Sequence, residues 1–289
     1  MTLTTNMTNL TGSATHYLFA SDFDQTLSFN DSGSVLTELI GASGFEHKVA
    51  GLARTNLVHQ GAELAYLLRH DPEFRTVRRR HLIETGHRVR LKGDIPRLVD
   101  LLQRGIDGCR FSFYVISAAP QEVIQAALEG IVAPDHIFGT VLEFDDTTGE
   151  ITSIARVPAG FGKVAVLEEI AAREQIALDR IIYVGDGHSD LHIMLHVNNR
   201  DGFTISVSEN MRLARVAKRT VLSESAFSVI LPVLEQVFGW HSSRIRTLFQ
   251  SYGLPLQEWE RIRTDLVTFG QGPVTEAALQ AGADTSLIA

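Results

Sequence analysis

Three short apolar segments, each followed directly by small and polar residues, most constrain the fold of this chain. They are HYLFAS before DFDQT, CRFSFYVIS before AAPQ, and RIIYVG before DGHSD. Their β-branched and aromatic residues favour buried strands, the first at Tyr17–Ser21. Helical patterns separate them, and strands that alternate with helices predict an α/β protein with a doubly wound parallel sheet.

The intervals between these segments carry their own patterns. Asp94 as an N-cap and Pro96 in the first turn are typical of a helix start. Two β-compatible runs joined by an Asp/Thr/Gly turn predict a hairpin at 141–157. The patterns further predict helices at 94–105, 119–130, 162–174 and 226–238, the last amphipathic, and one more strand at 201–208.

The strand signal disappears between the first and second apolar segments, which indicates an inserted unit. From about Phe29 to Leu91 only helix-compatible patterns occur, so we expect a helical cap there. The predicted organisation is a disordered tail at 1–16, a core at 17–28 and 92–238, the cap at 29–91 and a helical C-terminal extension at 239–289.

Composition limits the classes of partner. The formal net charge is −8, which gives no electrostatic case for binding nucleic acid or an acidic membrane and favours a small-molecule partner. Cys109 is the one cysteine, so no internal disulfide can form. The polar N-terminus does not resemble a secretory signal, and no apolar run reaches the ~18 residues that span a bilayer. We expect a soluble, cytoplasmic protein.

Four carboxylates are predicted to lie at one edge of the sheet. Asp22 and Asp24 follow the first strand, and Asp186 and Asp190 follow the third. Ligands of doubly wound sheets bind beyond the carboxyl ends of the strands, where both pairs fall. Carboxylates held together repel one another, and a bound cation removes that penalty. Mg²⁺ is the expected cation because it prefers oxygen ligands and keeps several waters.

The same edge offers groups suited to phosphate chemistry. Asp22 can attack phosphorus to form an aspartyl-phosphate, while Asp24 can protonate the leaving oxygen and later activate water. Ser117 ends the second strand before a helix N-terminus, where hydroxyl and N–H groups can bind phosphate oxygens. Lys163 opens another helix, where the helix dipole does not favour a cation and a phosphate partner would explain it.

In this order, the residues resemble the four motifs of the haloacid dehalogenase (HAD) superfamily. DFDQT, Ser117, Lys163 and GDGHSD span most of residues 17–190. The resemblance is closest to the phosphoserine phosphatase-like branch, which carries a helical cap between the first two motifs. It implies a Rossmann-like core and a Mg²⁺-dependent phosphatase that hydrolyses a small phosphorylated metabolite.

The resemblance also implies a role for each motif residue. Asp22 is the implied nucleophile and Asp24 the implied acid/base. The implied phosphate ligands are Ser117, Ala118 and Lys163. The implied metal ligands are Asp22, the main chain of Asp24, Asp186 and, in support, Asp190.

Asp31 bears on the choice of substrate. Phosphoserine phosphatases usually carry a Glu nine residues after the nucleophile to hold the substrate's ammonium, and Asp31 stands there in this chain. Asp31 is therefore either a substrate ligand or merely the N-cap of a helix. The stretch NDS also resembles related phosphatases that act on phosphocholine, phosphoethanolamine or enol-phosphates.

Other functions, and purely structural roles, also fit some of the same residues. A phosphotransferase would pass the phosphoryl group to an alcohol, and a non-catalytic binding or assembly protein would use the C-terminal extension as its contact surface. That extension is also the predicted contact of a possible homodimer. We interpret His188 as a bystander, residues 75–81 as a solvated basic face and Cys109 as a small core residue.

Overall fold

The computed structural model describes residues 14–55 and 58–254, in which seven strands form one sheet in the order β4-β3-β2-β1-β5-β6-β7. Neighbouring strands are parallel, except that β3 and β4 pair antiparallel as the predicted hairpin. The predicted doubly wound α/β sheet is confirmed. The strands are β1 His16–Ser21, β2 Arg110–Pro120, β3 Ile137–Phe144, β4 Ile151–Arg156, β5 Ile181–Gly185, β6 Phe203–Ser206 and β7 Arg219–Thr220.

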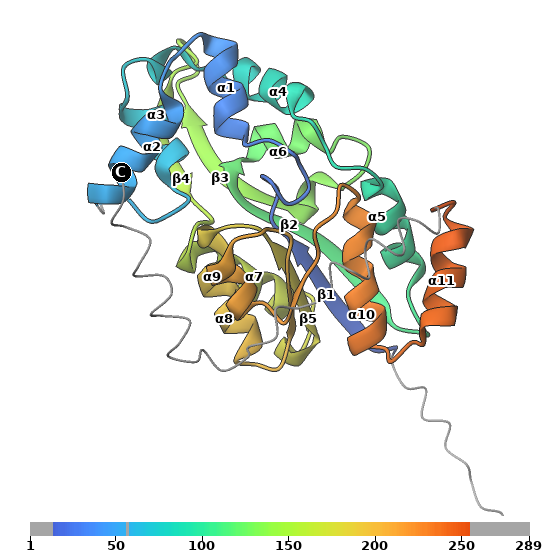
Figure 1. Cartoon of the computed structure of the whole chain (residues 1–289). Helices are drawn as coiled ribbons and strands as arrows, with labels where there is room; N and C mark the ends of the chain where they lie inside the picture. Colours follow the sequence, from blue (N-terminus) through green and yellow to red (C-terminus); the bar gives the residue numbers. More distant parts are fainter. Residues whose placement is uncertain (1–13, 56–57, 255–289) are drawn as a thin grey trace, which may run out of the picture.

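Helices cover both faces of the sheet (Figure 1). Successive side chains of a strand point to opposite faces, so Phe19 packs in one core cluster while Leu18 and Ala20 pack in the other. On the Phe19 side lie α5 Ile95–Arg104, α6 Gln121–Ala127, α10 Ile230–Gln236 and α11 Ser242–Ser251. On the other side lie α7 Phe161–Arg173, α8 Leu191–Asn198 and α9 Met211–Val216. Both faces of the central strands are buried, as their apolar sequences require.

Helices α1 to α4, which precede α5 in the segment between β1 and β2, gather at one end of the sheet (Figure 1). Ser28 and Leu91 form an isolated antiparallel bridge, so this cap leaves and rejoins the core at one place. Arg69 donates to the Thr152 carbonyl on the β3–β4 hairpin, which ties the cap to the core. The cap helices are α1 Ser32–Ile40, α2 Phe45–Thr55, α3 Glu63–His70 and α4 Arg79–Arg88, with a 3₁₀ turn at Phe74–Thr76.

Two element boundaries differ from the sequence prediction near the catalytic edge. β2 continues past Ser117 to Pro120, because an irregularity after Ile116 lets the strand regain its pairing with β3 at Thr140. A 3₁₀ turn at His188–Asp190 precedes α8, so the helix expected near Ser189 begins at Leu191.

Two predictions about helices also need correction. Asp94 precedes α5 with φ of 63°, and its carboxylate does not cap the helix, because it binds Arg97 and accepts from the Ser225 hydroxyl. The segment expected to form one amphipathic helix is a 3₁₀ turn at Ala226–Val229 followed by α10. Residues 226–234 are all buried, because α5 packs against the turn and α11 against the helix.

The described chain begins just before β1 and ends just after α11. His16 already belongs to β1, and residues 1–13 of the predicted tail lie outside the described residues. In α11, Ile245 and Phe249 are buried in the core cluster, so this part of the extension completes the core. Residues 255–289 lie outside the described residues, and a dimer through them stays a prediction. No helix in the described part is long and apolar enough to cross a membrane.

Candidate active site

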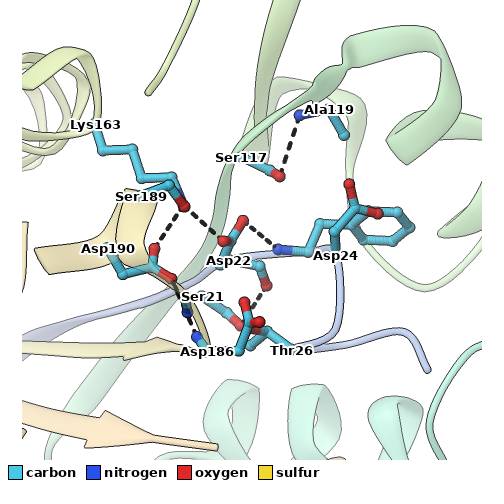
Figure 2. A network of polar contacts seen from close by, with 12 residues as sticks. Ser21, Asp22, Asp24, Thr26, Ser117, Ala119, Lys163, Asp186, Ser189 and Asp190 are labelled. Carbon is cyan, nitrogen blue, oxygen red and sulfur yellow. Dashed lines mark hydrogen bonds and ion pairs between the residues drawn. The ribbon is translucent and has the colours of Figure 1, made fainter. Parts of the chain in front are cut away.

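The parallel pairing of β1 with β5 brings the two acidic loops together at one edge of the sheet (Figure 2). Ser21 lies opposite Val184 in the register, and the Asp22 N–H donates to the Val184 carbonyl at 2.9 Å. Asp22, Asp24 and Asp186 therefore line one cavity together with Ser117 of the neighbouring β2.

Asp22 lies at the base of this cavity and is only 5% exposed. Its Oδ1 accepts the Phe23 N–H at 2.7 Å, and its Oδ2 lies 2.7 Å from the Lys163 ammonium. Burial raises the pKa of Asp22 to about 6 because it disfavours the charged form, while Lys163 acts in the opposite direction. The carboxylate is thus fixed in place with an unfavourable desolvation that added positive charge would relieve.

Lys163 and Asp190 form a fully buried ion pair behind Asp22, with 2.6 Å between Nζ and Oδ1. The Tyr183 hydroxyl also donates to Oδ1 at 2.6 Å. Oδ2 accepts the N–H groups of Asp186 and Gly187 at 3.1 and 3.0 Å. Burial alone would lower the pKa of Lys163, but Asp190 and Asp22 together raise it. Protein donors thus occupy both Asp190 oxygens, an arrangement that orients Lys163 and the loop.

Glycine is required at the end of β5. A Cβ on Gly185 would lie 2.5 Å from the Asp190 carboxyl carbon, closer than van der Waals contact allows. The absence of a side chain lets the loop fold back so that Asp190 reaches the backbone N–H groups at its start. This close approach explains the glycine in the motif GDGHSD.

The pKa of Asp186 is raised strongly. Burial, followed by the charges of Asp190 and Asp22, raises the pKa of Asp186 to about 8. The Thr26 hydroxyl donates to its Oδ1 over 3.3 Å, which makes a weak hydrogen bond. Carboxylate oxygens of Asp22, Asp186 and Asp190 lie within 4.8 Å of one another. A cluster of buried carboxylate oxygens suits a hard divalent cation such as Mg²⁺.

The Asp24 carboxylate takes no part in that cluster. It accepts the Ser32 N–H at 2.9 Å and lies 2.7 Å from the Ser32 hydroxyl, at the start of α1. Burial, followed by the charge of Asp31, raises its pKa well above the ordinary value. Figure 2 shows Asp24 and Asp190 on different sides of Asp22. Asp24 therefore reaches the cavity as a separate acid, and metal binding through its main chain stays a prediction.

Ser117, Ala118 and Ala119 form the wall opposite the acidic loops. The Ser117 hydroxyl is buried, receives the Ala119 N–H at 3.3 Å and helps to stabilise the charged form of Asp22. The Ala118 carbonyl accepts the Thr140 hydroxyl at 2.7 Å, which fixes this irregular end of β2. A hydroxyl held beside the nucleophile is suited to bind an oxygen of a tetrahedral anion.

The cap completes the cavity, whose volume is about 180 Å³. Gly61, at φ of 93°, approaches the core so closely that a Cβ would lie 2.9 Å from that of Ser189. The cap is therefore closed over the acidic loops in this structure. The cap residues that line the cavity are Asp31, Phe45, Val49, Gly61, Glu63 and Leu64.

Two of the residues around the cavity, Tyr183 and Glu63, could not be predicted from the sequence, whereas Asp31 and His188 were considered there. Asp31 is both the N-cap of α1, through the Ser34 N–H at 3.1 Å, and a lining residue, so neither interpretation excludes the other. Tyr183 reads as an ordinary core residue of its strand, and Glu63 as an ordinary helix residue. His188 is exposed to solvent at the loop surface and does not line the cavity.

Comparison with known proteins agrees with this geometry. The family model of the haloacid dehalogenase-like hydrolases matches residues 19–195. The chain belongs to this family. No curated protein matches the sequence.

Solved structures of the family share the fold. A substrate-bound phosphoserine phosphatase complex is 20% identical with a TM-score of 0.59, and the match covers 76% of this chain and 98% of that one. A phospho-aspartyl intermediate analogue of phosphoserine phosphatase is 20% identical with a TM-score of 0.58, over 75% and 98%. A HAD family hydrolase from Salmonella enterica serovar Typhi is 18% identical with a TM-score of 0.61, over 77% and 72%. The fold is therefore that of the phosphoserine phosphatase-like branch.

Proposed function

We propose that the protein is a Mg²⁺-dependent phosphatase that hydrolyses small phosphomonoesters through an aspartyl-phosphate on Asp22. The observation that carries this proposal is the placement of Asp22. Its buried carboxylate is held by Lys163 at the base of the cavity, with Ser117 on one side and Asp24 on the other. A nucleophile, a phosphate-binding cation and hydroxyl, and a separate acid are the groups that phosphoryl transfer to a carboxylate needs.

The first step moves the phosphoryl group onto the protein. An Asp22 carboxylate oxygen attacks phosphorus, and the bond between phosphorus and the substrate's ester oxygen breaks. The leaving oxygen takes the electron pair of that bond and a proton from Asp24. Lys163 and the Ser117 hydroxyl bind the non-bridging phosphate oxygens as charge shifts in the transition state.

The second step returns the group to water. Asp24, now ionised, removes a proton from a water molecule as the water oxygen attacks phosphorus. The bond to Asp22 breaks, and inorganic phosphate leaves with the Asp22 carboxylate regenerated. Burial raises the pKa of Asp24, which favours the protonated form that a general acid needs, and its bonds to Ser32 hold the carboxyl group in place.

Asp22 and Asp186 are the side chains that would hold the metal, together with the main chain of Asp24. When bound there, Mg²⁺ would supply positive charge between the carboxylates and the phosphate, and so reduce their mutual repulsion. Asp190 would support this arrangement from behind by fixing Lys163 and the loop that carries Asp186. The phosphoserine phosphatases of the same fold support the proposal, since one of those structures is described as a phospho-aspartyl intermediate analogue.

The direct test is phosphate release from an aryl phosphate and a panel of phosphorylated metabolites, with Mg²⁺ and with EDTA. The proposal expects metal-dependent release, which Asp22→Asn abolishes while the circular dichroism spectrum remains that of the folded protein. Full activity of Asp22→Asn would overturn the covalent route. Added acceptor alcohols separate hydrolysis from transfer, because a phosphotransferase would form new phosphate esters in place of free phosphate.

A further inference from the structure

A second cavity lies between the cap and the β3–β4 hairpin. Its volume is about 230 Å³, compared with about 180 Å³ for the active-site cavity, and the two share no lining residue. A water molecule needs only about 10–15 Å³ of such space, so the second cavity has room for a small metabolite. Side chains from the end of α3, from the 3₁₀ turn and from the hairpin line it, namely Leu68, Arg69, Arg75, Val77, Glu150 and Ile151.

Two arginines of this lining have N–H groups without a protein acceptor. Arg69 is half-buried, and its Nε donates to the Thr152 carbonyl at 2.8 Å. Within residues 14–55 and 58–254, that is the one hydrogen bond of the Arg69 side chain, and the exposed Arg75 side chain forms none. Because a guanidinium group carries five N–H donors, most donors of both residues are available to a ligand.

The charge of the cavity is positive after its ion pair is counted. Glu150 is the acidic residue of the lining, and the Arg78 guanidinium neutralises it at 3.0 Å. Arg78 is also bound to the backbone, because its Nε donates to the Thr148 carbonyl and its Nη1 to the Arg75 carbonyl. Arg78 therefore holds the turn against the hairpin, and the excess positive charge of the cavity lies on Arg69 and Arg75.

This arrangement favours one class of ligand. Guanidinium groups bind phosphate and carboxylate oxygens through paired N–H donors. Two guanidinium groups match the charge of a phosphate dianion, whereas a single carboxylate would neutralise only one of them. The remaining lining residues, Leu68, Val77 and Ile151, are apolar and would cover a short carbon chain attached to the phosphate.

We propose that Arg69 and Arg75 bind a phosphate group in this cavity, at a site separate from the catalytic edge. The ligand is either inorganic phosphate or the phosphate group of a short ester. This inference gives a function to one arginine of the basic run at 75–81, while Arg79 and Arg80 are exposed and do not line the cavity. It does not depend on the proposed catalytic reaction, because the two cavities have no residue in common.

The test follows the side chains themselves by nuclear magnetic resonance. Full-length protein is isotope-labelled at its arginine nitrogens, and inorganic phosphate is added in the presence of Mg²⁺. Arg69→Gln, Arg75→Gln and Arg80→Gln assign the three Nε–H signals through their loss. We expect the Arg69 and Arg75 signals to shift with one common dissociation constant, whereas the Arg80 signal should not shift.

The same variants measure the contribution of each arginine. Arg69→Gln removes one charged donor, so the phosphate affinity measured at Arg75 should fall about tenfold or more. The matched control is Arg80→Gln, which removes an exposed arginine of the same basic run and should leave that affinity unchanged. Acetate should bind more weakly than phosphate, because it carries one charge instead of two.

A further ligand separates the two sources of phosphate. Propylphosphonate has a carbon bonded directly to phosphorus, so a phosphatase does not hydrolyse it. Tighter binding of propylphosphonate than of phosphate would support an ester as the ligand, because the apolar lining would cover its carbon chain. Tighter binding of inorganic phosphate would support the free anion.

Three results would overturn the proposed site. They are an Arg75 signal that phosphate does not shift, an equal shift at Arg80, and an affinity that Arg69→Gln does not change. Binding of acetate as tight as that of phosphate would overturn the assignment to phosphate. Each of these results would leave the proposed phosphatase standing, and a protein that hydrolyses no ester would still support the site if phosphate shifts the Arg69 and Arg75 signals together.

Discussion

The two ends of the cavity differ in whether a cation of the protein neutralises their carboxylates. At the core end, Lys163 lies between Asp22 and Asp190, and each Asp190 oxygen has protein donors. At the cap end, Asp31 and Glu63 accept backbone N–H groups, and neither forms an ion pair with a residue of 14–55 or 58–254. The core end therefore neutralises its carboxylates with a cation of the protein, whereas the described residues supply no such cation at the cap end.

This difference suggests a division of work between the core and the cap. The sheet fixes the ends of β1, β2 and β5, so the groups for phosphoryl transfer come from a rigid frame. The cap contributes residues from α1, α2 and α3, which can differ without disturbing that frame. The comparison predicts that changes at the core end affect the reaction itself, while changes at the cap end affect the choice of substrate.

Asp24 should give the largest of the expected effects, because it lies at the core end but is held by the cap helix α1. Asp24→Asn removes the proton donor, so we expect kcat to fall about 10²- to 10⁴-fold with an alkyl phosphate. The fall should be smaller with p-nitrophenyl phosphate, whose leaving oxygen needs no proton. An equal loss with both esters would contradict the role of Asp24 as the acid.

Lys163 tests whether the core end depends on its buried cation. Lys163→Met leaves the charges of Asp22 and Asp190 uncompensated, so the free energy of unfolding should fall by about 3–5 kcal/mol. Urea denaturation without metal measures the change. As a control, Arg88→Met removes a cation from an exposed pair with Glu84 and should cost about 0.3–0.5 kcal/mol. Equal effects of the two substitutions would show that the buried cation stabilises the protein no more than an exposed one does.

The pH dependence of stability tests the buried carboxylates at the core end. In metal-free protein the pKa of Asp22 is about 6 and that of Asp186 about 8, both above the ordinary 3.8. The folded state thus binds these protons more tightly than the unfolded state does. The stability they contribute is fully present below about pH 4 and is lost as pH rises through about 6 and 8.

Thermal unfolding with EDTA should therefore show a melting temperature that falls by several degrees between about pH 5 and about pH 9. Mg²⁺ should raise the melting temperature more at the upper pH, because the ionised carboxylates bind it better. Asp186→Asn should flatten the metal-free profile. A melting temperature that rises with pH in EDTA would contradict the shifted pKa values.

The sequence identifies functional residues best where a residue type has few structural reasons to occur. Two aspartates at the end of a buried strand are costly without a partner, which is why the motifs around Asp22 and Asp186 could be found. The positions of six strands could also be predicted from their apolar segments, which end in turn residues. The two-residue strand β7 at Arg219–Thr220 was not predicted, because two residues form no pattern. Lys163 could be predicted as a site residue, but not its pairing with Asp190, since no local pattern specifies that contact.

The cap could not be predicted at the level of side chains. Glu63 belongs to ELAYLLRH, where helical spacing identifies Leu64, Leu67 and Leu68 as apolar but does not say that Glu63 turns into the cavity. Phe45 depends on the space left by Gly33, a contact between two helices. Such tertiary contacts follow from how the helices pack, which periodicity alone does not determine.

The most direct test of the account is to search for a phosphoryl group on Asp22 during turnover. Protein mixed with Mg²⁺ and a hydrolysed phosphate ester would be quenched in acid within milliseconds to seconds, digested, and examined by mass spectrometry. We expect a transient gain of one phosphoryl group on the peptide that contains Asp22, absent in Asp22→Asn. Sustained phosphate release with no phosphorylated protein, or with the group on another residue, would contradict it.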